Sequence, residues 1–425
     1  MATQQHYPNS AEERLVWYGI TASYPLFLIG ALYISGSLLG WIIIAMATLR
    51  WYVQGSESKA MISALVWMWI ASGLVMLLAL IVGHIDWALG FGQTIKSTIG
   101  WVKGWALIPL FLVIGSVINI KPEMLIRAIC ILAFHSFIFA SITLLVSFVG
   151  APGDLFISPL KFVGGPGDGF FTVSLYGLNP ESGGLRWRFF APWAPAAGFI
   201  SCLFLIFCLQ EKNRFWRNWG VIGCVAMCLF SQSRAGWAIF IILFPALLLA
   251  HKFKNPWWFI ALGVVIPMVV ILGQPLFESL MNAYEDVKAS RPGSTRVRAT
   301  LAKLAIERWQ AEAPIWGHGI VEPGPKIVEG MPIGSHHSWY GLLYVKGIVG
   351  FLALAVPLFF TTVYLLLQSH NNSLCRSAFF MLLVIFCYSF FENLEILSYL
   401  YWPVLIWIGM ALNPKKSAAF HALKR

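Results

Sequence analysis

Long runs of apolar residues alternate with short polar turns along most of this chain, from about residue 16 to about residue 412. A helix that crosses a bilayer needs about 20 predominantly apolar residues, and by that measure the pattern predicts about twelve membrane-spanning helices. They are expected at 16–33, 35–52, 60–84, 100–119, 121–149, 190–210, 215–231, 233–251, 256–274, 345–368, 375–393 and 395–412. The expected fold class is an all-α polytopic membrane protein in which residues 1–425 form a single transmembrane domain.

Two long polar segments interrupt the apolar runs, at 150–189 and at 275–344. The first is rich in glycine and proline and is expected to be an outer loop, in which the glycine-rich stretch 163–170 is a flexible part or a lid. The second carries apolar residues at helical spacing over 276–287 and again over 297–305, which indicates two amphipathic helices lying over the membrane domain. The second segment is therefore expected to be a large helical insertion outside the membrane.

Basic residues decide which way the predicted helices run through the membrane. An even number of spans places both termini on one side, and the short loops on that side carry an excess of lysine and arginine, which marks the cytoplasmic face. The residues concerned are Arg50, Lys59, Lys121, Arg127, Lys212, Arg214, Arg217, Lys252, Lys254, Arg376, Lys415, Lys416, Lys424 and Arg425. Both termini are therefore expected in the cytoplasm, and the two long polar segments on the outer face.

Composition supports a membrane protein and narrows its chemistry. Hydrophobic residues make up 59% of the chain and charged residues 11%, against about 25% charged residues in soluble domains. Residues 1–14 are polar and no cleavage site follows, so the first apolar run is expected to be a retained span.

The sequence gives no sign of a metal or nucleotide site. The seven cysteines lie within or beside apolar runs, which does not suggest a zinc site, and the glycine-rich stretch at 163–170 lacks the lysine of an ATP-binding P-loop. Neither ATP, a metal nor nucleic acid is expected as a ligand.

Arginines in the outer segments are the first candidates for function. Arg234 stands in a turn of only a few residues between two predicted spans, where the charge rule disfavours a cation. An arginine that merely reaches lipid headgroups is the alternative at each position. A guanidinium keeps its charge and can bind a phosphate through two parallel hydrogen bonds. Several arginines converging near the lipid surface predict a site for a lipid-linked diphosphate, and the candidates are Arg186, Arg188, Arg234, Arg296 and Arg298.

Two adjacent histidines, His336 and His337, stand where the second polar segment returns to the membrane. An unperturbed histidine has a pKa near 6.5, and nearby arginines are expected to lower that pKa. The neutral imidazole that results can act as a general base. A metal pair is disfavoured because adjacent side chains rarely reach one ion, and a histidine that only packs at the membrane interface is the other alternative. Glu392 and Glu395, in the turn between the last two spans, are expected to line a cavity.

Three motifs, in this order, resemble those of the O-antigen ligase and O-antigen polymerase superfamily of bacterial inner-membrane glycosyltransferases. The first is Ser-Arg-Ala-Gly at 233–236. The second is an outer-loop arginine, Arg296 or Arg298, followed by a helix and a Pro-x-x-Gly-x-Gly turn at 314–319. The third is a histidine followed by a small polar residue and two aromatic residues, at 337–340. The resemblance covers about 180–360 and extends to the N-terminal third only by hydropathy.

The sequence departs from the family pattern at two places. Ser338 stands where the family often has asparagine after the histidine, and Pro192-Trp193 stands where it often has Pro-Asn before the sixth span. The second departure leaves open which of Arg186 and Arg188 corresponds to the family's arginine.

The resemblance implies an enzyme of lipopolysaccharide assembly, similar to other C-type membrane glycosyltransferases. Such an enzyme transfers O-antigen polysaccharide from undecaprenyl diphosphate to the lipid A–core oligosaccharide, at the periplasmic face of the inner membrane, without a metal or other cofactor. Its partners are then the lipid-linked donor, the lipid A–core acceptor and membrane lipids. His337 is expected to be catalytic. The expected diphosphate- or substrate-binding residues are Arg186, Arg188, Arg234, Arg296, Arg298 and His336.

Other functions stay open at this level. An O-antigen polymerase or a protein O-oligosaccharyltransferase uses the same kind of donor with a different acceptor. A transporter or flippase is a different class, and it is disfavoured because the predicted span centres are almost free of charge and no internal repeat is visible. A structural scaffold gives no account of Arg234 or His337.

Overall fold

The computed structural model describes residues 6–54, 62–163, 165–179, 183–249, 292–328 and 330–422, and these are mostly helical. The α-helices are α1 (Ala11–Thr21), α2 (Ser23–Leu28), α3 (Leu32–Gln54), α4 (Ala64–Asp86), α5 (Phe91–Lys103), α6 (Leu107–Val117), α7 (Pro122–Phe148), α8 (Ala194–Cys208), α9 (Arg214–Ser231), α10 (Arg234–Leu249), α13 (Pro292–Glu312), α14 (Ser338–Ser369), α15 (Ser373–Tyr388), α16 (Leu394–Ala411) and α17 (Pro414–Ala422). The strands are β1 (Asp154–Ile157), β2 (Thr172–Ser174), β3 (Gly177–Leu178) and β4 (Leu185–Arg186).

Within the described part of the chain, six helical stretches are long and apolar enough to cross a membrane. They are Leu32–Val53, Ala64–Asp86, Phe91–Val117, Pro122–Phe148, Ser338–Ser369 and Leu394–Ala411. The expectation of a helical membrane protein is therefore confirmed. The shorter apolar helices α8, α10 and α15 pack among them. The total of about twelve spans stays a prediction, and the span expected at 256–274 lies outside the described residues.

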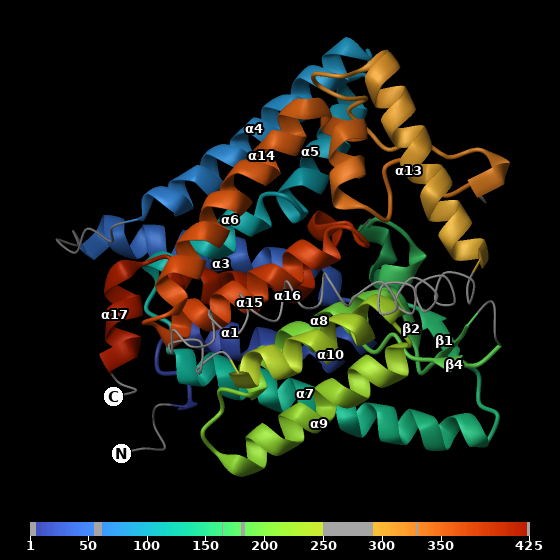
Figure 1. The fold of residues 1–425 in the computed structure, drawn as a ribbon. Coiled ribbons are helices and arrows are strands. Elements are labelled where there is room, and N and C mark those ends of the chain that lie inside the picture. Colours follow the sequence, from blue (N-terminus) through green and yellow to red (C-terminus); the bar gives the residue numbers. More distant parts are fainter. Residues whose placement is uncertain are drawn as a thin grey trace, which may run out of the picture.

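Both ends of the chain lie on one side of the molecule, whereas α13 and the strands lie on the opposite side (Figure 1). This arrangement is the one expected for an even number of spans. The two helices α6 and α16 form the centre of the bundle, where Trp407 and Tyr401 of α16 are fully buried. A Cβ atom on Gly115 of α6 would lie 2.0 Å from the carbonyl oxygen of Ile406, and one on Gly409 of α16 would lie 2.2 Å from that of Leu112. Glycine at both positions allows the two backbones to touch.

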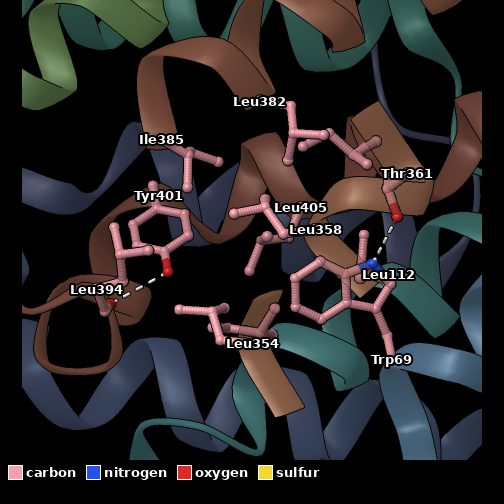
Figure 2. A pocket seen from close by; sticks show the side chains of 12 residues that line it. Trp69, Leu112, Leu354, Leu358, Thr361, Leu382, Ile385, Leu394, Tyr401 and Leu405 are labelled. Carbon is pink, nitrogen blue, oxygen red and sulfur yellow. Dashed lines mark hydrogen bonds between the residues drawn. The ribbon is translucent and has the colours of Figure 1, made fainter. Parts of the chain in front are cut away.

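A small apolar cavity of about 20 Å³ lies between α4, α6, α14, α15 and α16. Half of the residues that line it are leucines, and Figure 2 shows them around the cavity. Two hydrogen bonds pair polar atoms at its edge, from Trp69 Nε1 to Thr361 Oγ1 at 2.9 Å and from the Tyr401 hydroxyl to the Leu394 carbonyl at 3.1 Å. The cavity is a packing feature of the bundle and offers no groups for chemistry.

The polar segment at 150–189 contains more regular structure than the expected loop. β1 pairs with β2, and β3 pairs with β4, both antiparallel. The strands have two to four residues, which is too short for an alternating pattern of apolar and polar residues to be visible in the sequence. The expected all-α class is therefore corrected by two small two-stranded sheets outside the membrane bundle.

The helix predicted from the spacing over 297–305 is present as α13. Val297, Leu301 and Ala305 are buried on one face, where they form a small apolar cluster with Val328, Ile333 and Tyr344. This cluster fastens α13 to the first turns of α14. The companion helix predicted over 276–287 lies outside the described residues.

The helix expected to begin at residue 345 begins earlier, as α14, and is broken at Gly347, where the backbone has φ 61° and ψ −163°. The turn at 314–319 fills the break. Four backbone hydrogen bonds of 2.8 to 3.3 Å join the turn to the helix, from Ile348 N–H to Pro314, Val349 N–H to Ile315, His318 N–H to Tyr344 and Gly319 N–H to Val345. The groups freed by the break are thus paired. The Pro-x-x-Gly-x-Gly motif has a structural role, because it holds a discontinuous helix together.

Candidate active site

His337 caps the N-terminus of α14. Its Nδ1 accepts a hydrogen bond of 3.3 Å from the backbone N–H of Tyr340, and its ring stacks on the Tyr340 ring with 3.9 Å between centroids. The edge of Phe390 closes a further side of the imidazole, at 5.7 Å. A backbone N–H can only donate, so the neutral ring carries its proton on Nε2. The ring is therefore fixed in orientation before any substrate arrives.

The turn between α15 and α16 holds this helix end in place. Five hydrogen bonds of 2.7 to 3.0 Å join the two: His337 N–H to Asn393 Oδ1, Ser338 N–H to the Ser389 carbonyl, Ser338 Oγ–H to the Glu392 carbonyl, Leu394 N–H to Ser338 Oγ, and Trp339 Nε1–H to Ser389 Oγ. The hydroxyl of Ser338 both donates and accepts, as an asparagine amide also can. Serine can therefore serve at the position where the family often has asparagine.

A pocket of about 320 Å³ opens beside this helix end. His336 and His337 line it together with Arg298 from α13 and Phe390 from the α15–α16 turn. His336 has left-handed backbone, with φ 62°, a conformation that is uncommon for residues other than glycine. The two histidines, adjacent in sequence, thus line the same pocket.

Both histidines are neutral at physiological pH. Burial lowers the pKa of His337 to about 4. Burial, with a smaller contribution from Arg298, lowers the pKa of His336 to about 4. The direction agrees with the expectation from the sequence, but in His337 the cause is burial and not a neighbouring cation.

Glu392, which the sequence predicted only to line a cavity, lies beside the site. Its side chain is 1% exposed, and its Oε2 accepts a hydrogen bond of 2.8 Å from Trp193 Nε1. Burial raises its pKa to about 7, while Arg298, Trp193 and Arg186 act in the opposite direction. Two arginines, one from α13 and one from β4, therefore act on the same buried carboxylate. Such a perturbed carboxyl group beside a pocket is typical of functional sites.

Arg186 and Arg234 both stand at the turn between α9 and α10. Arg186 Nε donates a hydrogen bond of 2.9 Å to the backbone carbonyl of Ser231. Arg234 is the first residue of α10. Gln232, in the same turn, has left-handed backbone. Its side-chain amide donates a hydrogen bond of 2.8 Å to the backbone carbonyl of Leu185 in β4. The side chains of both arginines are half-buried. The short turn expected around Arg234 is thus present, and β4 is fastened to it.

Arg188 and Arg296 are placed differently. Arg188 is bound to the first small sheet, through a 3.0 Å ion pair with Asp154 and a hydrogen bond from Nε to Ser174 Oγ. Burial lowers its pKa, against the effect of Asp154. Arg296 is exposed on α13, because residues two apart on a helix point in nearly opposite directions. Of each pair left open by the sequence, Arg186 and Arg298 are the arginines whose charges act on Glu392.

Residues 219–355 match a family model described as O-Antigen ligase. The matched stretch contains Arg234, Arg298, His336 and His337, and it ends before Glu392. No curated protein matches the chain. The match confirms the resemblance to the O-antigen ligase family over these residues. Members of this family are glycosyltransferase-like enzymes of O-antigen processing, and the family implies lipid-linked polysaccharides as substrates.

Proposed function

We propose that this chain, with its O-antigen ligase domain at 219–355, transfers O-antigen polysaccharide from undecaprenyl diphosphate to the lipid A–core oligosaccharide. The observation that carries the proposal is the pocket where Arg298 meets two neutral histidines at the end of a membrane helix. The side that carries α13 is then the periplasmic side of the bacterial inner membrane, and both termini are cytoplasmic. A lipid-linked donor reaches such a pocket from within the bilayer.

The arginines supply the binding site for the diphosphate. Arg298, Arg186 and Arg234 come from three separate elements, and their charges stabilise the diphosphate as it leaves with the electrons of the broken bond. When no donor is bound, Glu392 offsets part of the charge of Arg298 and Arg186 in its ionised form. Arg188 has no part in this site, since Asp154 and Ser174 already occupy its guanidinium. No metal is required, because guanidinium groups provide the positive charge that a divalent ion would otherwise supply.

His337 takes the proton of the acceptor hydroxyl. The acceptor oxygen attacks the anomeric carbon, the bond from that carbon to the diphosphate oxygen breaks, and the hydroxyl proton moves to the imidazole. In the neutral ring the lone pair lies on Nδ1, where the cap bond to Tyr340 is long at 3.3 Å. The acceptor hydroxyl competes with that weak bond for the lone pair. A single displacement inverts the anomeric configuration.

The proposal is tested by reconstitution with a defined undecaprenyl diphosphate-linked donor and purified lipid A–core, with and without a chelator. We expect ligation that the chelator leaves unchanged. Transfer only to a second lipid-linked chain would identify a polymerase instead, and transfer only to a protein would identify an oligosaccharyltransferase. Movement of the donor across vesicles without any transfer would identify a flippase, and would contradict the proposal.

Two arginines on α13 provide a matched pair for the diphosphate site. Arg298→Lys keeps the charge but loses the two parallel hydrogen bonds. Since a charge-assisted hydrogen bond contributes about 1.5–3 kcal/mol, kcat/KM for the donor is expected to fall about 10- to 100-fold. Arg296→Lys, on the exposed face two residues away, is expected to stay within about twofold. Equal losses in both variants would place the diphosphate elsewhere.

A further inference from the structure

A second pocket, of about 680 Å³, opens at the far end of α13 from the histidines. It lies between the C-terminal end of α4 and the turn at 313–317, which follows α13. The C-terminal ends of α4 and α13 lie side by side in Figure 1. Its wall contains two indole rings, Trp87 and Trp316, and two carboxylates, Asp86 and Glu312. We call it the tryptophan pocket. No residue of this pocket belongs to the site that contains His337.

Buried and partly buried residues next to the tryptophan pocket fix the positions of Trp87 and Glu312. The Trp87 ring packs on the buried His318 ring with 4.8 Å between centroids, and His318 in turn stacks on Tyr344 at 4.2 Å. His318 Nε2 lies 2.8 Å from Glu312 Oε2, which Arg308 also binds at 2.8 Å. Trp87 nevertheless stays 39% exposed, and Glu312 keeps 37% of its side chain exposed. One aromatic surface and one carboxylate are therefore pre-positioned toward the open space.

This combination suits a neutral sugar. The C–H face of a pyranose ring packs on an indole, which offers a large rigid apolar surface, while its hydroxyl groups donate strong hydrogen bonds to carboxylates. Arg308 and His318 lower the pKa of Glu312 to about 2, so this group is ionised at every physiological pH. Among the described residues that line the pocket there are two carboxylates and no lysine or arginine, so the lining favours a neutral sugar over a phosphate. The tryptophan pocket is thus unsuited to the diphosphate or to a phosphorylated sugar.

The position of the pocket fits a glycan that continues from the reaction centre. Arg298 and Glu312 lie on one uninterrupted helix, and at 1.5 Å per residue roughly 21 Å separates them. Several sugar units span that distance. The turn at 313–317 belongs to the same segment that closes the break in α14, so both pockets share one rigid support.

We propose that the tryptophan pocket binds neutral hexopyranose units of one glycan substrate, several sugars away from the bond that is made. The inference rests on the proposed function for its substrates, and either the acceptor oligosaccharide or the donor polysaccharide can supply such sugars. Trp87 stacks on the sugar ring and Asp86 accepts its hydroxyl groups. Glu312, whose carboxylate is already bound by Arg308 and His318, accepts a further hydroxyl group at the part of its side chain that stays exposed. These are binding residues and take no part in proton transfer.

The test uses the full-length protein in detergent with the variants Trp87→Ala, Trp87→Phe and Asp86→Asn. Initial rates are measured against acceptor at saturating donor, and against donor at saturating acceptor. We expect Trp87→Ala to raise KM for one substrate about tenfold with kcat nearly unchanged, equivalent to about 1.4 kcal/mol. Trp87→Phe is expected to recover part of the loss, and Asp86→Asn to show a smaller one. The substrate whose KM rises is the source of the bound sugars.

Trp51→Ala is the matched control, because Trp51 is 38% exposed at the opposite end of the bundle and should change neither KM. Calorimetric binding of lipid-free core oligosaccharide and of free O-antigen repeat unit supplies a second readout that needs no turnover. Binding that weakens in Trp87→Ala supports the pocket even if the protein ligates nothing, in which case only the proposed function fails. Unchanged KM values and unchanged binding in Trp87→Ala and Asp86→Asn would overturn the inference.

Discussion

His337 has two roles in the proposed mechanism, and one substitution separates them. Asparagine is a strong N-cap residue, whereas alanine leaves the first turn of the helix without a cap, at a cost of about 0.5–2 kcal/mol. We expect His337→Asn to unfold near the wild-type temperature but to ligate about 10²–10⁴-fold more slowly, the usual loss for a missing general base. His337→Ala should lose both activity and stability.

The measurements are initial ligation rates and thermal unfolding in detergent. A His337→Asn protein that ligates as fast as wild type would show that the ring only caps α14. Equal destabilisation of both variants would instead mean that packing on Tyr340 and Phe390, and not the cap bond, is what the histidine provides.

Glu392 gives the protein a predictable pH dependence of stability. Its pKa is about 7 in the folded protein and about 4.3 in an unfolded chain. Between these values the folded state keeps a proton that the unfolded state has released, so this carboxyl group makes the fold less stable as pH rises through that window. Above pH 7 its contribution is constant.

Glu392→Gln removes this effect while keeping the shape of the side chain. The unfolding temperature of the variant, minus that of wild type, is expected to rise from about pH 4.3 to about pH 7 and then to level off. Thermal unfolding across this range measures the difference. Curves for the two proteins that stay parallel from pH 4 to 8 would mean that Glu392 is already ionised in the weakly acidic range.

At the scale of elements, the break in α14 depends on one glycine. Gly347 has φ 61°, and a Cβ atom there would lie 2.1 Å from the carbonyl oxygen of Ile315. Gly347→Ala is therefore expected to destabilise the protein by at least about 1–3 kcal/mol, the usual cost of strained backbone. Thermal unfolding and proteolysis of the turn at 314–319 report the loss.

Gly100 in α5 is the matched control. It is helical, and nothing lies within 4 Å of the Cβ that alanine would add. Gly100→Ala should leave stability unchanged or raise it by about 0.5–1 kcal/mol. If Gly347→Ala were as stable as Gly100→Ala, the turn would move readily and could not be the support that the two pockets share.

Elements were predictable from the sequence where they are long and periodic. The spacing over 297–305 identified α13 because its buried face repeats every four residues. The start of α14 was missed because the helix breaks at Gly347, and the turns before the break fall in the stretch 275–344 that the sequence pattern assigned to the outer polar segment. The motif at 314–319 was visible as a pattern, but its role depends on hydrogen bonds to residues 344–349 that no local pattern encodes.

At the scale of the whole molecule, apolar content was enough to predict the membrane class, because lipid leaves the backbone few alternatives to the helix. The candidate site was predicted in part. Spacing could not decide between Arg186 and Arg188, since only the fold brings the charge of one within reach of Glu392 and pairs the other with Asp154. The approach of Glu392 to Arg298 joins distant parts of the chain, and a single sequence gives no measure of such contacts.

The orientation of the whole molecule is the remaining prediction. With α13 outside and the α8–α9 turn inside, Lys303→Cys on α13 should react with a membrane-impermeant maleimide in intact spheroplasts, whereas Lys212→Cys should react only after lysis. The seven native cysteines give little background, because six are buried and the seventh is half-buried. Labelling of Lys212→Cys in intact spheroplasts would reverse the orientation. His337 would then face the cytoplasm, where no periplasmic acceptor could reach it.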